Sequence, residues 1–516
     1  MILSSVRIIT ILELLVFLLV AAVHLVHLDN LPRGLYLDES SIGLNAATIA
    51  DKGEDEFGQN YPLYFKAFGE YKNPVYIYSA AAVFYFFDVS VYNLRLTSAI
   101  FFILALLLIW ILVKRIFADN RYINFYTLIG FGFLPHYFNI SRVAFELISY
   151  LTFMSLFLLL QYLTFEGQSK LDESEKTSLI HKLLLSALTG ISLGVSIYTY
   201  STARLLSFVF LSTLGVIYFS RENISKLLLV VIFFLLTVSP WIVYINQNPD
   251  HLTGRFAEIS YLTDASTSIL TKAGTFVFEY LRYFNPNFLW FQGDANLRHT
   301  IGRGGLVYIS VLLLFLLSVY KYFCKQFPNH NKHILFLLTS AFFSIAPAAL
   351  TNDGTPHALR SLTLSLFVFL CSCYGFHWLV KDNKYKSVGL ALVFGLLVIE
   401  SLCFVDYYFK AYPNKSRAAF ESYGILESLQ SFHSDNPQSP KVVLSTSIHQ
   451  AQTHLNFFKY VLDSDLSYVS IEEPIPQENT CIIYDPKDQE SLDSNSTLEF
   501  VNHNQNDWFV KTRCYK

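Results

Sequence analysis

Long apolar stretches are the feature of this 516-residue chain that most restricts its fold. A helix that crosses the hydrocarbon core of a bilayer, roughly 30 Å thick, needs about 20 mostly apolar residues. Counted between charged residues, about eleven stretches approach that length. They lie near residues 8–26, 96–113, 122–138, 145–163, 183–200, 205–219, 227–244, 306–320, 334–350, 362–380 and 387–405. The sequence therefore predicts a mainly α, polytopic transmembrane helical bundle.

The charge content supports the same class. Only 15% of the residues are charged, whereas soluble domains average about 25%. The formal net charge is −3 and no basic block occurs, so the chain lacks the lysine and arginine density that a nucleic-acid backbone would require. Nucleic-acid binding is thereby excluded as a main role. Six cysteines in a chain of this length do not form a disulfide framework.

Basic residues in the loops predict the orientation. Lysine and arginine gather in cytoplasmic loops, and alternate loops here are rich in them, for example the loop with Lys114, Arg115 and Arg121. We expect a cytoplasmic N-terminus, with segment 8–26 as a retained anchor because it is near full spanning length and its residues 21–24 make a poor signal-peptide cleavage site. The predicted outer segments are then the first loop, 28–94, the large loop, 245–305, and the tail from about residue 406.

The apolar segment 74–89 is predicted to be an interfacial or re-entrant helix. Its tyrosines suit the membrane interface. Counting it as a twelfth span would place Lys114 and Arg115 outside and invert every later loop, which is the alternative interpretation.

Two domains are expected. Residues 1–410 form the membrane module, and residues 411–516 read as a small extracytoplasmic α/β domain. In the second, segments 441–446, 480–484 and 508–510 are strand-like, and segment 449–462 is helix-like. Its two cysteines, Cys481 and Cys514, would form a disulfide if their compartment oxidises thiols.

Two neighbouring carboxylates, Asp38 and Glu39, follow the first span by only about ten residues and so lie close to the membrane surface. The reduced dielectric there raises a carboxyl pKa toward values that suit a general base. The alternative is structural: Asp38 would cap a helix over residues 39–50 that Gly53 terminates.

Later in the same loop, Glu70, Tyr71, Lys72 and Asn73 immediately precede the interfacial segment. Lys72 would hold an anionic headgroup at that depth, or it is an ordinary snorkelling lysine.

Three short outer loops carry one arginine each, Arg142, Arg204 and Arg360, the last preceded by His357. Guanidinium groups match phosphate oxygens and stay charged, so a bundle that brings them together would form a phosphate clamp. Scattered interface anchors are the alternative. Glu146 lies one turn after Arg142, which we take as its partner.

The large loop adds Asp294, Arg298 and His299, which form either part of a site or a simple turn. No spacing such as His-x-x-x-His marks a metal site. The sequence thus requires no cofactor, and a divalent cation has no support from it.

Three motifs resemble the multi-pass glycosyltransferases of the GT-C class, most closely the bacterial relatives of protein O-mannosyltransferases and of lipid A aminoarabinose transferase. They are Asp38-Glu39 opening a large outer loop, Lys72-Asn73-Pro74 before an interfacial helix, and Arg95-Leu96-Thr97-Ser98-Ala99 at the start of the next span. The resemblance covers about residues 5–410. It departs at Asn73, where the relatives often have proline, and this changes the expected placement of Lys72.

The resemblance implies an enzyme of the plasma membrane, the bacterial inner membrane, that takes a sugar from a polyprenyl-phosphate donor at the outer leaflet and inverts the anomeric carbon. Asp38 would be the general base with Glu39 as its partner. Lys72 would bind the donor phosphate, and Arg204, Arg360, Arg142 and His357 are successively weaker matches for the same role. We further expect substrate contacts from Glu70, Tyr71, Asp294, Arg298 and His299.

Two other functions remain open at this point. A transporter or flippase of lipid-linked saccharides is one, although such proteins tend to have inverted repeats and midplane charges. An outer-leaflet polysaccharide polymerase or ligase with a diphosphate-linked donor is the other. The acceptor, whether protein, glycolipid or polysaccharide, is not specified by the sequence.

Overall fold

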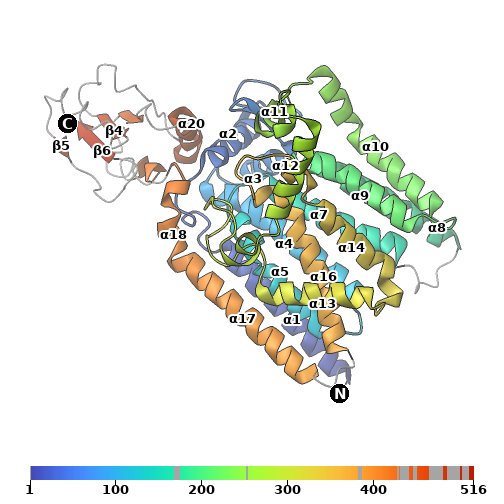
Figure 1. Cartoon of the computed structure of the whole chain (residues 1–516). Coiled ribbons are helices and arrows are strands. Elements are labelled where there is room, and N and C mark those ends of the chain that lie inside the picture. The colour runs from blue at the N-terminus through green and yellow to red at the C-terminus, as the bar shows by residue number, and fades with distance from the viewer. Residues whose placement is uncertain are drawn as a thin grey trace.

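Every predicted apolar stretch coincides with one or more helices in the computed structural model of the chain (Figure 1). The structure describes residues 2–167, 175–251, 254–381, 386–422, 424–426, 429–430, 441–444, 450–463, 480–484, 500–501 and 511–515. Within these ranges, seven helical segments are long and apolar enough to cross a membrane. The long bundle helices are α1 (Ile2–Leu25), α4 (Val91–Ile116), α7 (Leu147–Phe165), α8 (Glu175–Ser196), α10 (Ile224–Gln247), α16 (Leu362–Val380) and α17 (Lys386–Lys410).

Shorter apolar helices complete the bundle. They are α3 (Pro74–Phe86), α9 (Ala203–Tyr218) and α13 (Ile309–Phe323). At about 1.5 Å per residue, α3 is only some 20 Å long, too short to cross the hydrocarbon core. The segment is therefore a helix, as predicted, and its length favours the interfacial interpretation over a twelfth span.

Two stretches predicted as continuous spans are broken, and those predictions were wrong in this detail. Stretch 122–138 is divided into α5 (Tyr122–Gly132) and α6 (Pro135–Ile140), and stretch 334–350 into α14 (Asn331–Phe343) and α15 (Ala346–Ala349). A proline stands in the first turn of each second helix. Proline has no N–H to continue the preceding hydrogen-bond ladder, so it begins a new helix more easily than it extends one.

Glycines let the bundle helices approach closely. A Cβ at Gly190 of α8 would lie 2.3 Å from the carbonyl oxygen of Val230 on α10, and one at Gly375 of α16 would lie 2.0 Å from that of Leu314 on α13. Such small residues are what allow helix backbones to pack in contact inside a membrane.

The first outer loop folds into α2 (Leu37–Lys52) and a hairpin of β1 (Phe65–Ala67) and β2 (Glu70–Lys72), followed by α3. Helix α2 ends at Gly53, whose φ of 74° suits glycine, as the sequence predicted. The alternative in which Asp38 caps the helix was wrong, because the helix begins two residues earlier with Tyr36 as its cap. Asp38 therefore lies inside the first turn and does not cap the helix.

The large loop contains α11 (Gly254–Ile259), η1 (Tyr261–Thr263), α12 (Ile269–Arg282) and the π-helical turn η2 (Asn287–Phe291). Two further 3-10 turns lie later in the membrane module, η3 (Pro328–His330) and η4 (Leu359–Ser361). Figure 1 shows α2, α11 and α12 at one end of the bundle and the N-terminus at the other. The two large predicted outer loops thus share one end.

The tail begins with α18 (Tyr412–Lys415) and η5 (Arg417–Ala419) and contains a sheet of order β3-β4-β6-β5. The strands are β3 (Lys441–Leu444), β4 (Thr480–Tyr484), β5 (Phe500–Val501) and β6 (Lys511–Tyr515). β3 and β4 are parallel, and the other pairs are antiparallel. The predicted strands at 441 and 480 are confirmed, whereas segment 508–510 lies outside the described residues.

Helix α20 (Ala451–Leu462), predicted from its helical spacing, packs against α2. Ser40 Oγ lies 2.7 Å from His454 Nδ1. A Cβ at Gly43 would come within 2.5 Å of the Phe457 ring, so the absence of a side chain there allows this close packing. The tail is thereby in contact with the helix that carries Asp38.

Candidate active site

An ion pair between Asp38 and Lys72 joins the two motifs of the first loop. Asp38 lies in the first turn of α2 and Lys72 at the end of β2, so the hairpin brings the lysine back to the helix N-terminus. Lys72 Nζ donates to Asp38 Oδ1. The lysine side chain is 5% exposed, whereas the aspartate is 42% exposed. Asp38 thus presents a carboxylate to the surface with a buried cation directly behind it.

The charge of Lys72 is maintained by its neighbours. Burial alone would lower the pKa of Lys72, but the charge of Asp38 and the hydrogen bond to it outweigh burial and raise the pKa above its usual value. Nζ also lies 5.3 Å from the centre of the Phe68 ring, a cation–π distance. Lys72 is therefore a fixed ammonium group, able to bind an anion that competes with Asp38.

Asn73, the departure from the related motif, connects two further predicted residues. Its backbone N–H and side-chain Nδ2 donate to Glu146 at 2.6 and 2.9 Å, and its side-chain Oδ1 accepts from Arg204 at 2.8 Å. Arg204 also lies over the Tyr64 ring, 5.3 Å from its centre. Asn73 therefore fixes the position of the adjacent Lys72, and a proline there could make neither amide contact.

The predicted pair of Arg142 with Glu146 was wrong. Arg142 is fully buried and donates to the carbonyl oxygens of Val23 at 3.0 Å and His24 at 2.8 Å, at the end of α1. It also donates to the hydroxyl of Tyr408 at 3.2 Å. These acceptors satisfy Arg142 inside the bundle, which suits packing rather than binding of a donor phosphate.

Glu39 points into a different environment from that of Asp38. Its carboxylate receives two hydrogen bonds from Arg95, at 2.9 and 3.0 Å, and both side chains are 0% exposed. The N–H of Ala144 donates to it at 2.9 Å. Arg95 in turn donates to three carbonyl oxygens of the segment before α2, those of Leu28, Pro32 and Gly34. The pair connects the start of α2 to α4, and its burial leaves the Glu39 carboxylate inaccessible to an acceptor substrate.

A chain of charges runs from the first loop to the predicted phosphate arginine Arg360. Glu70 lies 3.8 Å from Arg255, Arg255 lies 3.8 Å from Asp353, and Asp353 lies 3.3 Å from Arg360. Burial raises the pKa of Glu70, and Lys72 partly offsets this effect. Arg255 was not predicted from the sequence. It lies in the predicted large outer loop, and an arginine in an outer loop is the same signal that identified Arg204 and Arg360.

Tyr71 contacts the same loop, because its hydroxyl lies 3.0 Å from His251 Nε2. The two rings stack with centres 4.0 Å apart. The hydroxyl of Tyr244 lies 3.0 Å from the other ring nitrogen, Nδ1. This histidine, also missed by the sequence reasoning, positions the hairpin edge that ends in Lys72.

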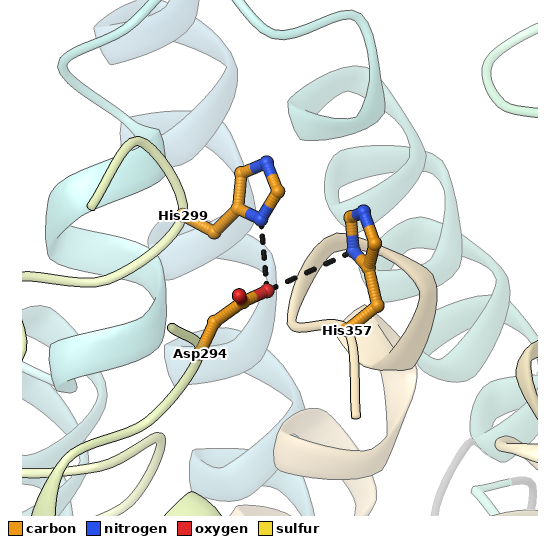
Figure 2. A group of neighbouring side chains, drawn as sticks. All are labelled: Asp294, His299 and His357. Carbon is orange, nitrogen blue, oxygen red and sulfur yellow. Dashed lines mark hydrogen bonds and ion pairs between the residues drawn. The ribbon is translucent and has the colours of Figure 1, made fainter. Parts of the chain in front are cut away.

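The residues predicted in segment 291–299 lie nearby but form their own group. Arg298 donates to Glu421 and to the carbonyl oxygen of Ala419 and lies over the Tyr36 ring, 5.5 Å from its centre. Asp294, His299 and His357 converge on one another (Figure 2). The sequence reasoning placed His357 with the phosphate arginines, whereas the structure places it beside Asp294.

No family model matches the chain, and no curated protein matches it by sequence. Solved structures do match. ArnT from Cupriavidus metallidurans, bound to undecaprenyl phosphate, superposes with a TM-score of 0.58 at 12% identity and covers 99% of this chain and 98% of its own. Its apo structure gives the same values. The oligosaccharyltransferase of Archaeoglobus fulgidus, in complex with Zn and sulfate, matches with a TM-score of 0.50 at 13% identity, over 88% of this chain and 62% of its own.

This chain has the GT-C fold. The match to ArnT spans the membrane module and the tail together, and it confirms the fold class predicted from the three short motifs. At 12% identity the likeness concerns the fold. The chemistry has to be argued from the residues that the fold brings together.

Proposed function

We propose that this protein is a membrane glycosyltransferase that moves a sugar from a polyprenyl-phosphate donor to an acceptor at the extracytoplasmic face. The observation that carries the proposal is the Asp38–Lys72 pair. It joins an exposed carboxylate to a buried cation at the end of the bundle that holds both large outer loops. Support comes from the GT-C fold and from ArnT, which binds undecaprenyl phosphate.

Donor binding begins with an exchange of partners at Lys72. The donor phosphate takes the place of Asp38 at the ammonium group, and the carboxylate is released toward the acceptor. Such an exchange suits this pair because Asp38 is 42% exposed and can turn away without leaving a buried charge of its own.

The transfer itself is a single displacement. Asp38 accepts the proton of an acceptor hydroxyl, whose oxygen forms a bond to the anomeric carbon. The bond from that carbon to the phosphate oxygen breaks, and its electron pair leaves with the polyprenyl phosphate. Attack opposite the leaving group inverts the anomeric centre. Lys72 stabilises the charge that develops on the phosphate, so a separate general acid is not needed.

Other predicted residues take positioning or binding roles. Glu39, expected from the sequence to be the partner of Asp38, positions Asp38 through its own pair with Arg95. Arg204 positions Lys72 through Asn73. Arg360 extends the cationic region, together with Arg255. Each of these cations is held by a carboxylate or amide partner that a phosphate would have to displace.

The location and the acceptor follow from the same site. We place the protein in the plasma membrane with its N-terminus in the cytoplasm, because the basic residues of alternate loops favour that orientation, and the proposed site lies at the opposite end of the bundle from the N-terminus (Figure 1). Protein hydroxyls, a glycolipid or a surface polysaccharide all fit an outward-facing base. Contact of α20 with α2 puts the tail where it could contribute to acceptor binding.

The test is a transfer assay with purified protein in detergent or proteoliposomes. Undecaprenyl-phosphate sugars carrying a radiolabel are supplied with an extract of cell-surface acceptors, and label transfer is measured. We expect transfer by the wild type and a loss of about 10²–10⁴-fold in Asp38→Asn, the usual contribution of a positioned base. Asp51→Asn, which changes an exposed aspartate on the same helix, is the matched control.

Three outcomes would contradict the proposal. Transfer only from diphosphate-linked donors would favour a polymerase or ligase. Movement of an unchanged lipid-linked saccharide across sealed vesicles, without transfer, would favour a flippase. Full activity of Asp38→Asn would show that Asp38 is not the general base, although the fold assignment would still hold.

A further inference from the structure

Asp294, His299 and His357 form a cluster of potential metal ligands apart from the Asp38–Lys72 pair. Their ligand atoms all lie within 4.8 Å of one another. Asp294 Oδ2 is 2.8 Å from His299 Nδ1 and 3.9 Å from His357 Nδ1. The three side chains are 5%, 10% and 15% exposed, respectively. Figure 2 shows both imidazole rings turning Nδ1 toward the same carboxylate oxygen.

The backbone around Asp294 holds its carboxylate in place. Gly293, with a φ of 84°, makes the turn that follows η2. Asp294 Oδ1 accepts from the N–H of Asn296 at 2.8 Å, and the hydroxyl of Thr300 donates to the Asp294 carbonyl oxygen at 2.9 Å. The N–H of Ala358, next to His357, donates to Oδ2 at 2.8 Å. The ligand atoms of two distant segments are thus fixed in advance.

One nitrogen atom of the cluster lacks a hydrogen-bond partner among the described residues. Among the described residues, His357 Nδ1 is buried and makes no hydrogen bond. The imidazole rings of His299 and His357 stack with centres 4.5 Å apart and planes 27° apart, and Nδ1 of His357 turns toward Asp294 Oδ2 (Figure 2). A buried polar atom without a partner carries a free-energy cost, and a bound cation would remove it.

We propose that Asp294, His299 and His357 bind a divalent cation of the zinc class. Two imidazoles and one carboxylate are a donor set that suits Zn²⁺ and its first-row neighbours, whereas Mg²⁺ and Ca²⁺ take oxygen ligands. Ligand atoms around a tetrahedral ion with bonds of about 2.0–2.1 Å lie roughly 3.4 Å apart. The separations of 2.8 and 3.9 Å lie on either side of that value. Three protein ligands leave one position for water or a substrate oxygen.

The ion would fasten the large loop to the segment that begins α16. His299 and Asp294 belong to the loop, and His357 precedes η4. Arg298, beside His299, lies over Tyr36, the residue that caps α2. Occupancy of the site therefore bears on the position of α2, although the site itself stands independently of the proposed transfer reaction.

Metal content of the purified full-length protein tests the proposal. The protein is treated with a chelator, reloaded with Zn²⁺ or Co²⁺ and freed of excess metal. Its metal content is then measured by inductively coupled plasma mass spectrometry. Co²⁺ additionally reports the ligand field through its visible absorption. We expect one equivalent of metal, with a Co²⁺ spectrum typical of tetrahedral or five-coordinate nitrogen and oxygen ligation.

Variants identify the ligands. His357→Gln and His299→Gln should each lower metal affinity at least about 100-fold, because even outer-shell changes cost about 10–100-fold. His27→Asn is the control, since it removes an exposed histidine at a φ of 55° that asparagine tolerates. Size-exclusion chromatography shows that each variant is folded. Absence of stoichiometric metal in the wild type, or unchanged affinity in both histidine variants, would overturn the proposal. Neither result depends on a transfer assay.

Discussion

The pair of Glu39 and Arg95 makes a quantitative prediction that separates a positioning role from a chemical one. Glu39→Gln keeps the shape of the side chain and removes its charge. Arg95, which is 0% exposed, would then be a buried cation without a counterion. Losing one partner of a buried pair costs about 3–5 kcal/mol. The three carbonyl oxygens that also accept from Arg95 place the expected cost near the lower end, about 3 kcal/mol.

Thermal unfolding in detergent measures that cost. Because 1 kcal/mol shifts the Tm of a 150–250-residue domain by about 2–4 °C and that of a larger chain by less, we expect the apparent Tm of Glu39→Gln to fall by roughly 3–8 °C. Asp51→Asn, exposed on the same helix, should change the free energy of unfolding by no more than about 0.5 kcal/mol. Adding Arg95→Met to Glu39→Gln should restore part of the loss, because the stranded charge is then gone.

The refuting result is specific. If Glu39→Gln unfolds at the wild-type temperature but fails to transfer sugar, then the carboxylate takes part in the reaction beside Asp38, and its contacts with Arg95 and Ala144 do not describe its role. Partial activity together with the lower Tm is the outcome that positioning requires.

Three further predictions concern other parts of the chain. Lys72→Met should lower kcat/KM for the lipid-phosphate donor by about 10²–10³-fold, the usual loss for one electrostatic partner of a developing charge. The control is Lys66→Met, which changes an exposed lysine on the neighbouring strand. Equal effects of the two substitutions would contradict the role of Lys72 in binding the donor phosphate. Burial raises the pKa of Glu56 above 4.5, so the ionised form is disfavoured in the folded state. The wild type should therefore lose stability relative to Glu56→Gln as pH rises from about 4.5 through the folded-state pKa, which Tm measurements of both proteins across pH would show; a constant difference would refute this. Cys481 and Cys514 are direct partners across the β4–β6 pair, a spacing at which a disulfide can form; mass spectrometry of protein from an oxidising compartment should show a linked peptide pair, and two free thiols would contradict it.

The sequence predicted the bundle well because length and polarity decide it. A run of 20 apolar residues has few alternatives to a helix in a membrane, and every such run is helical here. Local chemistry was also reliable where one residue determines the backbone, as at Gly53, which ends α2. The points at which helices end and restart were predicted less reliably. The breaks before α6 and α15 depend on single prolines within otherwise apolar runs.

Partners distant in sequence could not be predicted. Spacing of one turn suggested that Arg142 binds Glu146, but Asn73 reaches the carboxylate from 73 positions away. Arg95 was noted as part of a motif, yet its partner Glu39 lies 56 positions earlier. The ligands Asp294 and His357 are 63 positions apart, by subtraction, in separate loops. No periodic pattern encodes such contacts, because the packing of the bundle decides them.

The most direct test of the central claim is made in cells. Surface glycans and glycoproteins are compared by mass spectrometry in cells that lack this chain, that express the wild type, and that express Asp38→Asn at the same membrane level. The account predicts that one sugar substituent is absent without the protein, returns with the wild type, and stays absent with Asp38→Asn. Return of that sugar with Asp38→Asn would contradict the claim that this carboxylate carries out the transfer.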